Sequence, residues 1–136
     1  MLVSEIMTKN VVTVNSDYTI LEACKRYFRY RIGCLVVLQD RRVVGIVTER
    51  DLISKVIIGQ KDHFEVKVKA IMSKDIITIH PDADVKEAVD VMKKNKIKKL
   101  PVVSDIGDLV GIITITDIIY VMPHHFKTLA QECRIE

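Results

Sequence analysis

The chain of 136 residues contains an internal duplication, and this limits its fold more than any other feature. IMTKNVVTV at residues 6–14 returns as IMSKDIITI at 71–79, and GIVTERDLI at 45–53 returns as GIITITDII at 111–119. Between these matches, residues 20–40 align with residues 85–105. A period of about 65 residues is too long for a solenoid of single helix pairs. Two copies predict a pseudo-twofold pair, because one copy alone is too small to bury its apolar faces.

Each copy begins with a predicted strand or extended segment followed by a helix. VVTV and IITI are short β-branched runs that favour extended backbone. Thr19 with Glu22, and Asp84 with Glu87, have the spacing of a capping box or a close variant, which marks the start of a helix. The apolar residues that follow have helical spacing and predict one buried stripe per helix. They are Ile20, Ala23, Cys24 and Tyr27 in the first copy, and Val85, Ala88, Val89 and Met92 in the second.

A β-hairpin and a second helix complete each copy. CLVVL and VVGIVT flank a polar turn at residues 40–42, and LPVV and LVGIIT flank a turn at 105–108 in which Gly107 supplies a freer backbone. The second helices begin at Thr48 and Thr114, and Pro123 is expected to end the latter. The order β-α-β-β-α predicts an α+β fold with repeats at 4–60 and 68–123. Residues 54–69 form a polar connector and residues 124–136 a C-terminal tail.

Composition limits the class of protein. Hydrophobic residues make up 49%, enough for a core, and the net charge of +3 neither requires nor excludes a polyanion. With no signal peptide and no apolar run of membrane-span length, we expect a cytoplasmic protein with no membrane contact. Cys24, Cys34 and Cys133 lack zinc-like spacing and are interpreted as buried thiols. No nucleophile–base pair, phosphate-cradling glycine loop or metal triad is present, so we expect no enzyme activity, catalytic cofactor or metal.

The doubled phrase Gly-h-h-Thr-x-x-Asp, where h is aliphatic, has a structural and a functional interpretation. Thr48 and Thr114 suit helix N-caps, and Asp51 and Asp117 lie where a carboxylate reaches back to the cap amide, which stabilises by about 1 kcal/mol per cap. Its occurrence in both copies favours a function as well. Free amides and a hydroxyl suit a phosphate, whereas a carboxylate accepts hydrogen bonds from ribose hydroxyls. Together they fit a nucleoside phosphate.

The order of these motifs resembles a tandem pair of cystathionine-β-synthase (CBS) domains, a Bateman module. The resemblance covers residues 4 to 122 and is carried by the repeated IM(T/S)K(N/D), the Glu-Ala helix, LPVV and Gly-h-h-Thr-x-x-Asp. It implies two repeats packed through their sheets about a pseudo-twofold axis, with two clefts between them. It also implies an adenosine-containing ligand (AMP, ADP, ATP or S-adenosylmethionine), a sensor role toward an unidentified regulated protein, and a homodimer formed through helices.

The resemblance implies that each cleft takes residues from both copies. In the first cleft, Asp117 would hold the ribose, Thr114 or Thr116 would meet ribose or phosphate, and Lys96 would face a phosphate. The first cleft comprises Thr114, Thr116, Asp117, Ile112 and Lys96, opposite Asn10, Val12 and Ile32. The second comprises Thr48, Arg50, Asp51, Ile46 and Arg31, opposite Met72, Asp75, Ile77 and Ile97. The first follows the family pattern more closely in its junction and its proline, because the first copy has Val36 where the second has Pro101. Arg31 and Arg50 favour the second cleft instead, since together they suit bidentate contacts to a phosphate.

Other features carry weaker functional interpretations. KKNKIKK at 93–99 suits a solvated helix end, a phosphate funnel or nucleic acid, but no reading motif accompanies it. His124 and His125 are interpreted as a surface pair. The alternative function is a nucleic-acid-binding or protein-interaction scaffold that uses the fold without a small ligand. That alternative predicts no nucleotide effect but strongly salt-dependent nucleic-acid binding.

Overall fold

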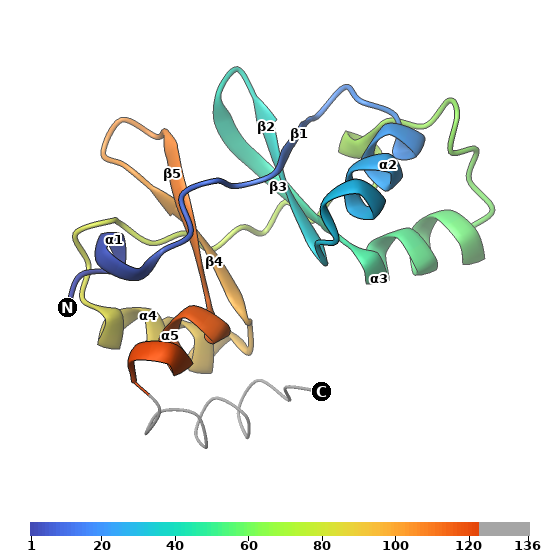
Figure 1. Cartoon of the computed structure of the whole chain (residues 1–136). Helices are drawn as coiled ribbons and strands as arrows, with labels where there is room; N and C mark the ends of the chain where they lie inside the picture. Colours follow the sequence, from blue (N-terminus) through green and yellow to red (C-terminus); the bar gives the residue numbers. More distant parts are fainter. Residues whose placement is uncertain (123–136) are drawn as a thin grey trace. The chain divides into compact units, whose positions relative to one another are not determined.

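A computed structural model describes residues 1–122 and shows two compact units (Figure 1). Among the described residues, unit 1 comprises 1–11 and 77–122, and unit 2 comprises 12–76. The units are therefore offset from the sequence repeats. The Ile-Met segment that opens each copy packs in the unit built around the other copy's hairpin. The mixed α+β class and the two repeat units are confirmed.

Unit 2 is built on a three-stranded sheet in the order β1 (Thr13–Asn15), β2 (Cys34–Gln39) and β3 (Arg42–Thr48). β1 lies parallel to β2, and β2 pairs antiparallel with β3. Asp40 and Arg41 form the hairpin turn with φ values of 52° and 68°, as a two-residue turn with the twist of the strands requires. The predicted hairpin is thus confirmed.

The helices of unit 2 begin where the sequence predicts them. α2 (Ile20–Tyr30) has the expected capping box, since Thr19 and Glu22 each accept from the other's backbone amide. α3 (Glu49–Asp51) runs directly into the π-helix η1 (Leu52–Ile58), and a 3-10 helix, η2 (Val68–Ala70), follows. The expectation that a polar connector begins at residue 54 is wrong in its first part, because helical structure continues to residue 58.

Unit 1 contains α1 (Val3–Ile6), α4 (Val85–Asn95), the hairpin β4 (Lys99–Val103) and β5 (Leu109–Thr114), and α5 (Ile115–Val121). Gly107 has φ 89° in the hairpin turn, as expected. The first strand predicted for this copy is reduced to a single parallel bridge between Ile79 and Val102. α5 ends at residue 121, while Pro123 lies outside the described residues, as do His124, His125 and Cys133.

The predicted capping box at Asp84 and Glu87 is wrong in its second half. Asp84 caps α4, but its carboxylate accepts from the Lys86 amide, and Glu87 makes no reciprocal bond to the cap. A capping side chain can accept from the second or the third amide of the helix, and Asp84 accepts from the second. The cap is retained and the reciprocal contact is lost.

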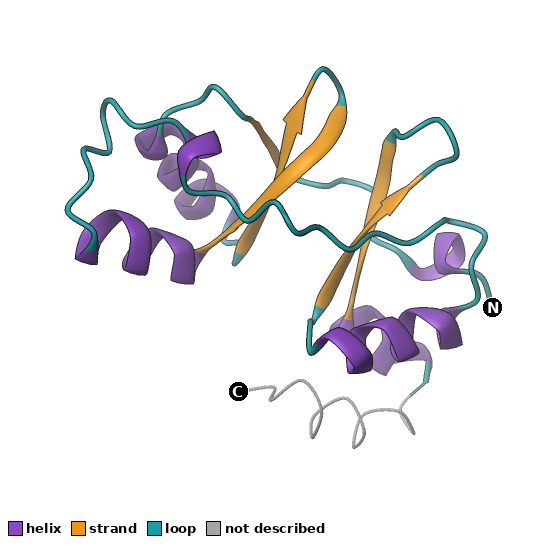
Figure 2. Ribbon diagram, turned by 180° about the vertical axis from the view of Figure 1, so that it is seen from behind, coloured by secondary structure: helices purple, strands orange, loops and turns teal. Residues whose placement is uncertain are grey.

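Each unit has its own apolar core, and its helices accompany its hairpin (Figure 2). The predicted stripes are buried, except that Cys24 is half-buried. Tyr27 belongs to the core of unit 2, where its hydroxyl donates to the Val47 carbonyl. Burial raises the pKa of Tyr27 far above its ordinary value, so the hydroxyl stays protonated as this bond requires. Met92 is the corresponding buried residue of unit 1.

The glycine of each Gly-h-h-Thr-x-x-Asp phrase lies beneath the methionine of an Ile-Met segment. A Cβ on Gly111 would lie 2.6 Å from the Met7 sulfur and 2.9 Å from the Thr8 carbonyl oxygen, and one on Gly45 would lie 2.4 Å from the Met72 sulfur. Two backbone hydrogen bonds join each segment to its strand: Thr8 with Ile112 at 2.8 and 2.9 Å, and Ser73 with Ile46 at 2.9 and 3.0 Å. Only glycine permits this approach.

We expect Gly111→Ala to lower the free energy of unfolding by about 1–3 kcal/mol, because the added methyl group overpacks a contact that includes backbone. Urea unfolding monitored by circular dichroism measures the loss. Met7→Ala in the same chain makes room for the methyl group, so the double variant is expected to lose less than the sum of the single variants. If the losses of stability in Gly111→Ala and Met7→Ala simply add in the double variant, the contact with Met7 is not what excludes a side chain at position 111.

Candidate functional site

The first Thr-x-x-Asp junction lies in unit 2, where β3 passes into α3. The Thr48 amide donates to Asp51 Oδ2 at 2.9 Å, and the Asp51 amide donates to Thr48 Oγ1 at 3.2 Å. The Thr48 hydroxyl lies 3.1 Å from the same carboxylate oxygen. This reciprocal pair confirms the capping interpretation of the motif.

The second junction, between β5 and α5 in unit 1, repeats this geometry. The Thr114 amide donates to Asp117 Oδ2 at 2.9 Å, and the Asp117 amide donates to Thr114 Oγ1 at 3.2 Å. Capping thus accounts for one carboxylate oxygen of each aspartate. The other oxygen, Oδ1, is what each junction can offer to a ligand.

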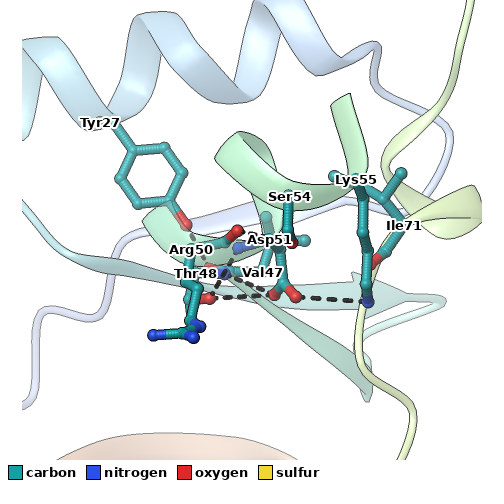
Figure 3. Close-up of polar contacts among 8 residues, drawn as sticks. All are labelled: Tyr27, Val47, Thr48, Arg50, Asp51, Ser54, Lys55 and Ile71. Atoms are coloured by element: carbon teal, nitrogen blue, oxygen red, sulfur yellow. Dashed lines mark hydrogen bonds and ion pairs between the residues drawn. The ribbon is translucent and has the colours of Figure 1, made fainter. Parts of the chain in front are cut away.

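The two Oδ1 atoms have different partners. Lys55 Nζ lies 3.3 Å from Oδ1 of Asp51 and also donates to the Ile71 carbonyl at 2.8 Å (Figure 3). Among residues 1–122, Oδ1 of Asp117 receives only the Thr8 hydroxyl, at 3.5 Å, the limit of a hydrogen bond. The carboxylate of Asp117 is therefore the more available acceptor for a ligand hydroxyl.

Two of the predicted phosphate-facing residues hold a left-handed backbone. Arg31 follows α2 with φ 52° and ψ 49°, and Lys96 follows α4 with φ 55° and ψ 45°. Glycine is the usual residue at this position after a helix, and a residue with a side chain there costs about 1–2 kcal/mol. A cation at the same strained position in both copies is an outlier that favours a functional role for the side chain.

The remaining predicted residues divide between the units, each of which holds most of one set. Unit 1 carries Asn10, Lys96, Ile112, Thr114, Thr116 and Asp117 of the first set, and Ile77 and Ile97 of the second. Unit 2 carries Arg31, Ile46, Thr48, Arg50, Asp51, Met72 and Asp75 of the second set, and Val12 and Ile32 of the first. Asn10, Arg50, Asp75 and Thr116 are exposed, and both capping pairs are half-buried. The roles that the sequence assigns to these residues stay predictions.

Two residues at the junctions, Lys55 and Thr8, were missed by the sequence analysis. Lys55 lies four residues after Asp51 on the same helical face, so its spacing alone could have indicated the ion pair. The contact of Thr8 with Asp117 spans 109 residues of sequence and has no local pattern. The alignment of the copies offered no help, because Val121 stands at the position that corresponds to Lys55.

Some sequence expectations concern other chemistry. Within residues 1–122, no group of three or more histidine, cysteine or acidic side chains could hold a metal ion, and no helix is long and apolar enough to cross a membrane. The expectation of buried thiols is wrong for Cys24 and Cys34, because each of these side chains is only half-buried. Burial raises the pKa of the Cys24 thiol, which makes it a weak nucleophile.

Comparison with known proteins identifies the family. A family model described as the CBS domain matches twice, at residues 3–58 and 68–124. The chain therefore belongs to the CBS domain family and contains a tandem pair of these domains. The resemblance drawn from the repeated motifs is confirmed.

Similar proteins differ in length and in what is known of them. An uncharacterized protein of Methanopyrus kandleri is 36% identical over 133 residues, which are 97% of this chain and 68% of that protein. An inosine-5′-monophosphate dehydrogenase of Korarchaeum cryptofilum is 37% identical over 127 residues, but the chain spans only 25% of that enzyme. The crystal structure of a CBS domain pair in complex with 5′-methylthioadenosine and S-adenosyl-L-methionine superposes with a TM-score of 0.79 at 30% identity, covering 91% of this chain and 97% of that one.

We expect Lys96→Gly to raise the free energy of unfolding by about 0.5–1 kcal/mol, because glycine adopts the left-handed backbone without steric cost. Lys94→Gly is the matched control, since it removes the same charge within the last turn of α4 and is expected to destabilise by about 1 kcal/mol. Denaturant unfolding of both variants separates backbone from charge effects. Equal destabilisation by the two substitutions would remove the argument for strain at Lys96.

Proposed function

We propose that the protein is a regulatory sensor whose two Thr-x-x-Asp junctions bind adenosine-containing ligands. The observation that carries this is the second oxygen of each aspartate, which remains directed away from the cap after Oδ2 is used. A carboxylate oxygen in this position accepts hydrogen bonds from ribose hydroxyls. The family and the ligands of the similar CBS pair support adenosine as the core of the ligand.

The remaining predicted residues complete the proposal. Thr114 is engaged in the cap, so the exposed Thr116 hydroxyl is the better group to meet ribose or phosphate in unit 1. Arg31 and Arg50 offer bidentate contacts to phosphate in unit 2. We propose AMP, ADP, ATP or S-adenosylmethionine as ligand, with no catalysis by this chain. Its output is a ligand-dependent change in stability or shape that a regulated protein recognises in the cytoplasm.

The proposal predicts that an adenosine ligand stabilises the protein. At a ligand concentration of a hundred times its dissociation constant, the expected gain is about 2.7 kcal/mol, measurable as a rise in melting temperature. A thermal-shift panel of AMP, ADP, ATP, S-adenosylmethionine and NAD tests this, with inorganic phosphate and GMP as controls. Absence of a shift with every adenosine compound would overturn the proposal.

Asp117→Asn tests the ribose contact without removing the cap, because an amide oxygen still accepts from the Thr114 amide. We expect the affinity of the Thr114–Asp117 junction for adenosine to fall about 10–100-fold and its affinity for 2′-deoxyadenosine much less, because a hydrogen bond to a charged group is lost. Titration calorimetry measures both affinities. Asp90→Asn, an exposed position on α4, is the control. Equal losses for ribose and deoxyribose ligands would show that Asp117 does not bind the sugar.

We also propose that the protein is a homodimer that uses helix surfaces of unit 2. Phe28 on α2 is 88% exposed, and Ile57 and Ile58 on η1 are 71% and 73% exposed. Large apolar side chains gathered on helices of one small unit are typical of an interface. We expect Phe28→Ser to shift sedimentation equilibrium toward monomer, while Asp90→Ser on the exposed face of α4 does not. A wild-type protein that is monomeric at 100 μM, on the order of ten times a weak dissociation constant, would contradict the dimer.

A further inference from the structure

Lys55 gives the two junctions different charges, although their motifs match. Its ammonium group lies 3.3 Å from Oδ1 of Asp51, and the Ile71 carbonyl holds it there at 2.8 Å (Figure 3). The Asp51 side chain is only 17% exposed, so its charge is poorly screened by water and is largely offset by this neighbour. The Lys55 side chain is 42% exposed and remains accessible to a ligand.

Unit 1 has no equivalent of this lysine. Val121 takes the corresponding place four residues after Asp117, and Thr116 takes the place of Arg50. Among residues 1–122, no cation forms an ion pair with Asp117, whose Oδ1 has only the Thr8 hydroxyl at 3.5 Å. Within the described residues, the Asp117 carboxylate therefore has no paired cation, and Lys96 is the basic residue predicted to face its ligand, whereas the Asp51 carboxylate is paired with Lys55 and has Arg50 beside it in the chain.

An adenosine ligand carries its charge at the 5′ position, which the ribose hydroxyls hold at a fixed distance from the carboxylate. An uncompensated aspartate repels a 5′-phosphate and attracts a 5′-sulfonium ion, and a paired aspartate does neither. Lys55 also occupies one lone pair of Oδ1 of Asp51, which leaves less capacity for two ribose hydroxyls. The two junctions thus differ both in charge, which distinguishes ligands by their 5′ group, and in acceptor capacity, which affects ribose binding by every adenosine ligand.

We propose that Lys55 is a specificity-determining residue that commits the Thr48–Asp51 junction to anionic, phosphate-bearing adenosine ligands and leaves the Thr114–Asp117 junction to uncharged or cationic ones. This inference rests on the proposed function, since it assigns a ligand class to each junction of the sensor. A purely structural role is the competing explanation, because Lys55 ties η1 to the residues that precede Met72. The two explanations differ in what they predict for ligands of unequal charge.

AMP and 5′-methylthioadenosine are matched probes, because they share the nucleoside and differ in the charge of the 5′ substituent. Titration calorimetry in an Asp117→Asn background isolates the Thr48–Asp51 junction, where AMP is expected to bind about tenfold tighter than 5′-methylthioadenosine. Lys55→Gln keeps a donor for the Ile71 carbonyl and removes the charge. It should weaken AMP about 3–30-fold and change 5′-methylthioadenosine less than about twofold.

The reverse experiment uses an Asp51→Asn background, which isolates the Thr114–Asp117 junction. There 5′-methylthioadenosine should bind at least as tightly as AMP, and Val121→Lys should raise the AMP affinity about threefold or more. Val121 is 40% exposed, so a lysine fits without displacing core residues. Lys55→Arg is expected to keep the AMP preference, and Lys61→Gln, which removes an exposed charge elsewhere in unit 2, to leave both affinities unchanged.

The outcomes separate the inference from the function on which it rests. A wild-type protein that binds neither probe overturns the proposed function, and the specificity assignment with it. A wild-type protein that binds both probes, while Lys55→Gln weakens them equally, overturns the assignment alone and shows a structural lysine. Urea unfolding of each variant confirms that affinities are compared between folded proteins.

Discussion

Each unit depends on the close approach of an Ile-Met segment to the glycine-bearing strand of a hairpin. Met7 over Gly111 and Met72 over Gly45 fill the space that a side chain on the strand would need. The approach allows paired backbone hydrogen bonds, which add one more extended chain to each hairpin. It also brings Thr8 to Asp117, across 109 residues of sequence. The packing of Met7 over Gly111 thus places Thr8 beside the Asp117 carboxylate.

In the proposed function, a single carboxylate at each junction serves structure with one oxygen and ligand binding with the other. Oδ2 of Asp51 and of Asp117 completes a helix cap, and Oδ1 is left for other partners. Because the cap fixes the rotamer of the side chain, the second oxygen is held in place before any ligand arrives, which lowers the entropic cost of binding. A motif that is justified by helix capping alone is therefore also preorganised for recognition, and the two interpretations of the sequence are compatible.

Much of this was predictable because it is encoded locally. Thr19 with Glu22, and Thr48 with Asp51, lie three residues apart, so spacing alone predicted the caps, and β-branched runs on either side of polar turns predicted both hairpins. Asp84 caps its helix as predicted, but its carboxylate accepts from the Lys86 amide, and Glu87 makes no reciprocal bond to the cap. The π-helix, the Thr8 contact and the methionine over each glycine depend on tertiary packing. The pairing of Lys55 with Asp51 is encoded locally by a spacing of four residues, but Val121 replaces the lysine in the second copy, so the shared motifs of the copies do not reveal it.

The offset between the compact units and the sequence repeats has a consequence for how a duplicated chain of this kind can arise. Duplication copied a length of chain that opens with an Ile-Met segment, yet in folding that segment joins the hairpin of the other copy. In an ancestral chain with a single copy, the Ile-Met segment could pack on a hairpin in this way only if two molecules exchanged their segments. Covalent fusion of two copies then replaces an exchange between separate chains with an exchange inside one polypeptide, which no longer depends on protein concentration.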